Sequence, residues 1–137
     1  MKILAVDDDP FIRELLPVVF RKAEYPHLTL ADSGAAALDL LKTTAEPFDC
    51  LLLDIEMPQM DGITLCREVR KLEAYQDTPI LMVTLRSDAA SIERAFAAGA
   101  NDYVTKPFGI DELLARVRTQ LRGRGREDNS SDSETSA

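Results

Sequence analysis

The segment ILAVDDDP, residues 3–10, joins four apolar residues directly to three aspartates and a proline. An uninterrupted apolar run of this kind is typical of a parallel strand that is covered on both faces. Pro10 has the fixed backbone angle that suits the first residue of a helix. The segment therefore predicts a buried strand that ends in carboxylates and leads at once into a helix.

The same alternation of a short apolar strand and an amphipathic helix repeats along the chain. The predicted strands are residues 3–6, 28–31, 50–53, 80–83 and 103–104. Apolar residues recur between them at helical spacing, as they do in residues 12–20. This order, with short connections, predicts an α/β fold: a doubly wound five-stranded parallel sheet in the order 2-1-3-4-5 with five helices.

Local signals set several helix boundaries. Ser33 is the predicted N-cap of the second helix, and Ser87 or Asp88 that of the fourth, which ends at Gly99. Pro17 lies inside the first predicted helix, where a proline removes one backbone hydrogen bond. We therefore expect a bend at this position.

The composition excludes several classes of function. Twenty-four acidic residues against sixteen Lys and Arg leave a formal net charge of −8. This balance argues against direct binding of nucleic acid, which depends on clustered Lys and Arg, and against docking on an anionic membrane. No apolar run approaches the roughly 20 residues that span a bilayer, and the N-terminus has no signal-peptide core. We therefore expect a cytoplasmic protein, with Cys50 and Cys66 as buried, reduced thiols.

The composition changes at Gly123. Residues 123–137, GRGREDNSSDSETSA, have no apolar periodicity. Such polar, charged segments cannot bury enough apolar surface to fold by themselves. The sequence therefore predicts one domain over residues 1–122 and a polar, disordered tail over residues 123–137.

Carboxylates collect where two of the predicted strands end. Asp7, Asp8 and Asp9 follow the first strand, Asp54 follows the third, and both ends lie at the carboxyl edge of the sheet. Carboxylates gathered there repel one another unless a hard cation lies among them, and oxygen ligands suit Mg²⁺. A helix cap needs only one aspartate. The pattern therefore predicts a metal site.

Two further residues fall at the same edge of the sheet. Thr84 follows the fourth strand, and Lys106 comes just after the fifth. A hydroxyl, an ammonium group and a metal ion that converge on one carboxylate suit a phosphoryl group, with Asp54 as the attacking nucleophile. Each residue alone is ordinary, and their joint position carries the prediction.

Four segments together resemble the receiver domains of response regulators in two-component signalling. The match covers roughly residues 1–122 and rests on ILAVDDDP (3–10), LDIEMPQMDG (53–62), VT (83–84) and AGANDYVTKPF (98–108). By this resemblance Asp54 is the phosphoacceptor. Asp7, Asp8 and Asp54, with the backbone carbonyl of Glu56, would hold Mg²⁺, for which Mn²⁺ can substitute.

The resemblance also implies a switch. Thr84 and Lys106 would contact the phosphoryl oxygens, and Tyr103 would change rotamer as Thr84 moves inward. The Lys106–Pro107 peptide bond is expected to be cis, an isomer found in only about 5–6% of X–Pro bonds. Asp9 matches no ligand position of the family and is interpreted as a helix cap.

The function implied is a phosphorylation-dependent switch, not an enzyme with an external substrate. A histidine kinase or a histidine phosphotransfer protein would donate the phosphoryl group to Asp54. The domain would catalyse its own phosphorylation and dephosphorylation. The altered surface of the fourth helix, fifth strand and fifth helix would then control a downstream protein or an output domain. The sequence leaves open a stand-alone receiver and a part of a longer regulator.

A further resemblance would imply a homodimer through the same surface. The segment around Tyr103 and the fifth helix resembles a subgroup of winged-helix transcription factors, in which Asp102, Glu112 and Arg116 would join a symmetric dimer face. Ile92 stands where that face usually has a basic residue, which weakens the case for a dimer.

Three residues are expected to tune the phosphoryl lifetime. Leu85 stands where the family usually has a small residue, so it either narrows access to Asp54 or turns aside. Glu56 and Arg86 occupy the two positions that vary most with the dephosphorylation rate in the family. Their opposite charges can pair over the site.

Rival functions fit the residues less well. A phosphatase of the haloacid-dehalogenase type needs Thr or Val where Phe11 stands, and it carries a cap domain. A flavodoxin-type carrier would hold the phosphate of FMN in the loop where three aspartates would repel it. A receiver that works without phosphorylation would not need the complete set of Asp7, Asp8, Asp54, Thr84 and Lys106.

Overall fold

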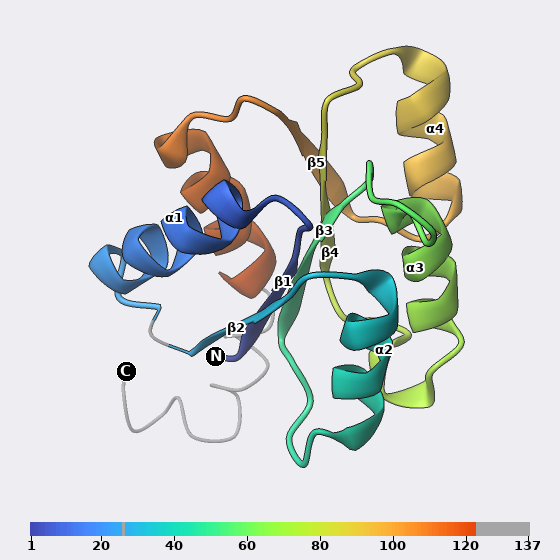
Figure 1. The fold of residues 1–137 in the computed structure, drawn as a ribbon, viewed down its shortest axis with the longest axis horizontal. Helices are drawn as coiled ribbons and strands as arrows, with labels where there is room; N and C mark the ends of the chain where they lie inside the picture. The colour runs from blue at the N-terminus through green and yellow to red at the C-terminus, as the bar shows by residue number, and fades with distance from the viewer. Residues whose placement is uncertain (26, 123–137) are drawn as a thin grey trace.

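The computed structural model describes residues 1–25 and 27–122 (Figure 1). Its elements are β1 (Ile3–Val6), α1 (Pro10–Lys22), β2 (Leu28–Ala31), α2 (Gly34–Thr43), β3 (Cys50–Asp54), α3 (Gly62–Arg70), the 3-10 helix η1 (Glu73–Tyr75), β4 (Ile80–Thr84), α4 (Ala89–Ala97) and β5 (Asp102–Thr105). A last helix is described over residues 110–122. The predicted tail, residues 123–137, lies outside the described residues.

The five strands form one parallel sheet in the order β2-β1-β3-β4-β5. Val6, the last residue of β1, pairs with Leu53 of β3. The residues that follow these two, Asp7 and Asp54, are therefore brought to the same edge of the sheet. Both the predicted strand order and the predicted doubly wound architecture are confirmed.

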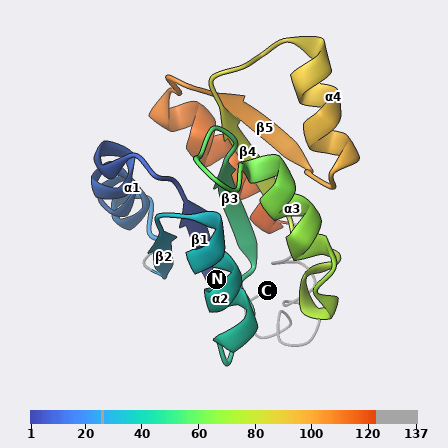
Figure 2. The same cartoon turned by 45° about the vertical axis from the view of Figure 1, so that its right-hand side comes forward.

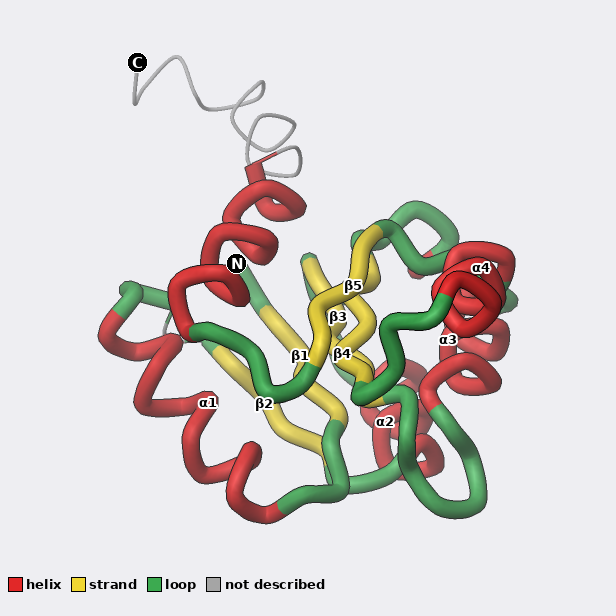
Figure 3. Tube along the Cα trace, turned by 90° about the horizontal axis from the view of Figure 1, so that it is seen from above, coloured by secondary structure: helices red, strands yellow, loops and turns green. Residues whose placement is uncertain are grey.

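Helices cover both faces of the sheet. α1 and the helix over residues 110–122 lie on one face, and α2, α3 and α4 lie on the other, as Figure 3 shows from above. Figure 2 shows the second group from the front. Successive residues of a strand point to opposite faces, so Ile3 packs in the core under α1 while Leu4 packs in the core under α2 and α3.

Short polar side chains cap the N-termini of helices at the predicted positions. Asp9 accepts a hydrogen bond from the Phe11 amide and caps α1, and Ser33 caps α2. Asp88, one of the two candidates, caps α4 by accepting from the Ser91 amide. α1 continues past Pro17 to Lys22, so the proline does not end the helix.

Other expectations concern buried thiols and membrane spans. Cys50 and Cys66 are both buried, in agreement with the prediction. None of the helices within residues 1–25 and 27–122 combines the length and apolar character needed to cross a bilayer.

Candidate functional site

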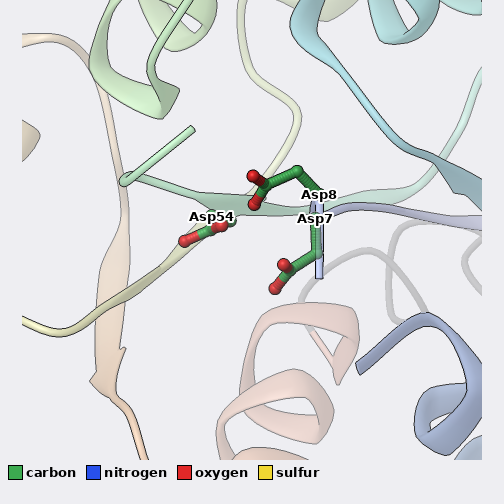
Figure 4. Close-up of side chains that lie close together, drawn as sticks. All are labelled: Asp7, Asp8 and Asp54. Carbon is green, nitrogen blue, oxygen red and sulfur yellow. The ribbon is translucent and has the colours of Figure 1, made fainter. Parts of the chain in front are cut away.

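Three carboxylates from two neighbouring strand ends form the centre of the site. Asp7 and Asp8 follow β1, and Asp54 is the last residue of β3. One oxygen of each lies within 4.8 Å of the others. Asp7 and Asp54 are only 4% and 2% exposed, while Asp8 is exposed. Figure 4 shows Asp7 and Asp8 leaving the end of β1 on the side that faces Asp54.

Burial and crowding disfavour the ionised form of Asp54. Burial is the largest cause and the negative charge of Asp7 the second, and together they raise the pKa of Asp54 from 3.8 to about 7. Lys106 offsets only part of this effect. A divalent cation among the carboxylates would reverse it, because its charge favours the ionised form.

The donor set fits a hard cation. It consists of carboxylate oxygens, two of them from buried residues and one from a residue open to solvent. Mg²⁺ in proteins binds to one or two carboxylates and keeps several of its waters. The predicted metal ligands Asp7, Asp8 and Asp54 are therefore brought together in an arrangement that suits Mg²⁺.

Lys106 enters the site from the end of β5. Its Nζ lies 3.0 Å from Asp7 Oδ2 and 3.4 Å from Asp54 Oδ1. Burial alone would lower the pKa of Lys106, but the hydrogen bond to Asp7 and the charges of both carboxylates outweigh it and raise the pKa. The Lys106 amide donates to the Thr84 carbonyl at 2.7 Å, which ties it to the end of β4. The Lys106–Pro107 bond is cis, as expected.

Thr84 lies at the end of β4 with only 2% of its surface exposed. Its hydroxyl donates to Glu56 Oε2 at 2.7 Å and accepts from the Arg86 amide at 2.9 Å. The Leu85 amide donates to the other oxygen, Glu56 Oε1, at 2.9 Å. Glu56 therefore binds the main chain and hydroxyl at the end of β4.

The ion pair of Glu56 with Arg86, which the sequence left open, is absent from the ion pairs of the described residues. Both carboxylate oxygens of Glu56 are already engaged by Thr84 and Leu85. Leu85 is 66% exposed, and its two predicted roles, narrowing access to Asp54 or turning aside, both stay predictions.

Gly62 has a structural role in the site that was not predicted from the sequence. It begins α3, and its amide donates to the Ile55 carbonyl at 2.9 Å. A Cβ at this position would lie 2.8 Å from the Ile55 Cα and would clash with the Asp54 carbonyl oxygen. Only glycine allows α3 to begin this close to the backbone of Asp54 and Ile55. The dipeptide Asp61-Gly62 after a loop is a sequence signal for such a position.

Tyr103 lies on β5, beside the face of α4. Its ring meets the ring of Phe96 edge-on, with the centroids 6.2 Å apart and the planes at 83°. The side chain is half-buried and packs against the core under α3 and α4. The structure thus places the proposed switch residue between the sheet and an exposed helix.

Three predicted dimer residues come together within one chain. Arg116 donates to both carboxylate oxygens of Asp102 at 2.9 Å and lies 3.5 Å from Glu112. The three side chains belong to β5 and to the helix over residues 110–122. The fold therefore gathers these charges on one surface.

Comparison with known sequences points to one family. The family model described as "Response regulator receiver domain" matches residues 3–118. The "Response regulator MprA" of Mycobacterium avium is 40% identical over 129 residues, which are 94% of this chain and 54% of the relative. The "DNA-binding dual master transcriptional regulator RpaA" of Synechocystis is 38% identical over 123 residues, 88% of this chain and 49% of the relative. The chain thus spans about half the length of these relatives.

Comparison with solved structures gives the same family. A response regulator from Chloroflexus aurantiacus has a TM-score of 0.81 and 40% identity, and the match covers 88% of this chain and 97% of that one. The chemotaxis protein CheY4 of Vibrio cholerae has a TM-score of 0.80 and 32% identity, over 86% of this chain and 96% of that one. Both the fold and the sequence are therefore similar to response regulators along almost the whole described chain.

Proposed function

The chain belongs to the response regulator receiver domain family of two-component systems, and we propose that it takes a phosphoryl group onto Asp54. The donor is the phosphohistidine of a histidine kinase or of a histidine phosphotransfer protein. One observation carries the proposal: the carboxylates of Asp7, Asp8 and Asp54 converge with the Lys106 ammonium at the sheet edge where β4 ends in Thr84.

The chain's own groups support an attack by Asp54. A carboxylate oxygen of Asp54 forms a bond to phosphorus while the bond from phosphorus to the donor nitrogen breaks. The histidine, protonated on its other ring nitrogen, leaves as neutral imidazole. Lys106, which already lies within 3.4 Å of Asp54, neutralises a phosphoryl oxygen. The Thr84 hydroxyl donates a hydrogen bond to a second phosphoryl oxygen.

Mg²⁺ would be held by Asp7, Asp8, Asp54 and the backbone carbonyl of Glu56, with Mn²⁺ as a substitute. When bound, it would supply positive charge that stabilises the phosphoryl oxygens and keeps Asp54 ionised. The acyl phosphate on Asp54 is then hydrolysed within the same site. The lifetime of this acyl phosphate is set by residues around the end of β4, namely Glu56, Leu85 and Arg86.

The output surface consists of α4, β5 and the helix over residues 110–122. We propose that phosphorylation moves Thr84 and Tyr103 and so shifts this surface between two states. The surface then acts on a downstream protein or output domain, or forms a homodimer through Asp102, Glu112 and Arg116.

The proposed domain comprises residues 1–122, with the polar segment 123–137 beyond it, and it works in the cytoplasm. One relative of about twice this length is named a DNA-binding regulator. In a protein built that way, DNA contacts would belong to the output domain, because this chain carries a net charge of −8.

The test is phosphorylation by acetyl phosphate in Mg²⁺, followed by intact mass. The wild-type chain should gain one phosphoryl group, and Asp54→Asn should gain none. Beryllofluoride, which mimics the phosphoryl group, should shift the amide resonances of α4 and β5. Wild-type protein that neither gains the mass nor shows the shifts would refute the proposal, and turnover of an external phosphate monoester would favour the phosphatase.

A further inference from the structure

The carboxylate of Glu56 accepts hydrogen bonds from two donors at the end of β4. The Thr84 hydroxyl binds one oxygen at 2.7 Å and the Leu85 amide binds the other at 2.9 Å. Two donors that fit two oxygens of a carboxylate also fit two oxygens of a phosphoryl group. We infer that Glu56 is an internal competitor, which occupies these donors until a phosphoryl group on Asp54 displaces it. The inference rests on the proposed function.

The position of Glu56 in the chain makes this competition direct. Glu56 lies two residues after Asp54, and its own amide donates to Asp54 Oδ1 at 3.3 Å. Its side chain leaves this point and reaches the end of the neighbouring strand, β4. The competing carboxylate is therefore anchored beside the nucleophile and reaches toward the donors that the phosphoryl group needs.

The number of available protons makes the two states exclusive. A threonine hydroxyl has one proton, and Thr84 donates it to Glu56 while accepting from the Arg86 amide at 2.9 Å. The Leu85 amide also has one proton, and it too is committed to Glu56. Thr84 is buried, so water does not readily replace a lost partner. Neither donor can serve a phosphoryl oxygen well until Glu56 leaves.

Charge then drives Glu56 away from the site. A phosphoryl group on Asp54 places a second anion beside the Glu56 carboxylate, and like charges at short range repel. Arg86, an exposed cation two residues after Thr84, is the charge at the end of β4 that can receive Glu56. The pair of Glu56 with Arg86 then belongs to the phosphorylated state, whereas in this structure Glu56 binds Thr84 and Leu85.

Three single substitutions separate hydrogen bonding from charge. Glu56→Gln keeps the shape but loses the charge and one acceptor. Glu56→Asp keeps the charge but is one methylene shorter, so it no longer reaches the end of β4. Glu46→Gln removes the same charge from an exposed loop between α2 and β3, at the opposite end of the sheet, and serves as the control.

The first measurement is the amide resonance of Leu85 in metal-free protein. A bond to a carboxylate moves an amide proton downfield, so Glu56→Gln and Glu56→Asp should both move this resonance upfield. Glu46→Gln should leave it in place. An unchanged Leu85 resonance in the two Glu56 variants would overturn the inference before any phosphoryl mimic is added.

The second measurement is the affinity for beryllofluoride at saturating Mg²⁺. Glu56→Gln and Glu56→Asp should both bind it more tightly than the wild type, by about tenfold, which is the factor expected for one charge-assisted hydrogen bond. If only Glu56→Gln binds more tightly, charge alone explains the effect and the inference is wrong. Weaker binding by Glu56→Gln would also overturn it, because Glu56 would then support the phosphorylated state.

The two measurements also separate this inference from the proposed function. Wild-type protein that binds beryllofluoride, with Glu56 variants that bind it equally well, leaves the phosphoacceptor role intact and removes the competitor. If neither wild-type protein nor any variant binds it, the phosphoacceptor role fails and the competitor fails with it. The Leu85 resonance would still report whether the hydrogen bond exists.

Discussion

Two partly buried cationic side chains lie at opposite edges of the sheet, Arg70 where β4 and β5 begin and Lys106 where the strands end. Arg70, at the end of α3, donates to the carbonyls of Tyr75, Thr78 and Gly99 at 2.6–3.1 Å and to the Asn101 side chain at 3.0 Å. Lys106, at the other end, faces the carboxylates of Asp7 and Asp54.

The two ends differ in the charge of the groups that the cations contact. The acceptors of Arg70 are neutral and fixed in the chain, so its five donors are satisfied by the fold alone. The partners of Lys106 are two carboxylates that also repel each other, so that end keeps an excess of negative charge. We therefore expect the Arg70 end to stabilise the fold and the Lys106 end to take up a ligand.

Removal of the Lys106 ammonium should have the largest effect on function. Lys106→Ala should slow phosphorylation of Asp54 by acetyl phosphate by about 100-fold or more, because it removes a donor aimed at the developing charge. The rate is read by gel shift of the phosphorylated form. Lys71→Ala, which removes an exposed cation from the far end of α3, is the control. A rate near that of the control would remove Lys106 from the site's chemistry.

Removal of the Arg70 guanidinium should instead reduce stability. Arg70→Ala leaves the carbonyls of Tyr75, Thr78 and Gly99 without this donor, and we expect the free energy of unfolding to fall by about 3 kcal/mol. Urea unfolding measures it, with the exposed Arg67→Ala on the same helix as the control. The folded variant should still be phosphorylated, and a lost phosphorylation in fully folded protein would contradict the division between the two ends.

Neutralising Asp54 should stabilise the metal-free domain. The pKa of Asp54 rises from 3.8 to about 7 on folding, so between these values the folded state keeps a proton that the unfolded chain has released. The contribution of Asp54 to the free energy of unfolding therefore falls as the pH rises through this window, and the penalty is complete above it. At pH 8, Asp54→Asn should be about 2 kcal/mol more stable than the wild type.

Thermal unfolding across this pH range, without metal, tests the effect. The exposed Asp39→Asn on α2 should show no such gain. Equal stability of Asp54→Asn and wild type at pH 8 would show that Lys106 already balances the charge. Added Mg²⁺ should stabilise the wild type more than Asp54→Asn.

The smallest effect is expected at Leu85. Its side chain is 66% exposed, so Leu85→Ala should change the rate of autodephosphorylation by only about two- to threefold, through the access of water to the acyl phosphate. The decay of the phosphorylated form is followed after removal of the donor. Val18→Ala, another exposed apolar position on α1, is the matched control. An unchanged decay would show that Leu85 simply turns aside.

Much of the fold could be predicted from local patterns. The strand–helix alternation and the caps at Asp9 and Ser33 depend on neighbours in the sequence. β5 was predicted only as residues 103–104, because its apolar signal is weak, yet pairing with β4 extends it over Asp102–Thr105. That extension comes from a partner strand, which no local pattern reveals.

The site shows the same limit of local patterns. Its carboxylates, Thr84 and Lys106 could be predicted because parallel strands end at one edge. The hydrogen bonds of Glu56 with Thr84 and Leu85 could not, because they join residues 28 and 29 positions apart and depend on a side-chain rotamer. The hydrogen bonds of Arg70 with Gly99 and Asn101 could not be predicted from the sequence either, because only the fold brings these distant residues together.

The register of β1 against β3 has a practical consequence for measuring ligands. Asp7 and Asp54 meet only when Val6 is paired with Leu53, so the unfolded chain has no site. A ligand that binds only the folded state raises the melting temperature in proportion to the logarithm of its concentration once it exceeds the dissociation constant. A melting curve recorded at graded concentrations of Mg²⁺ or beryllofluoride therefore serves as a binding isotherm for this domain, without a label and without a partner protein.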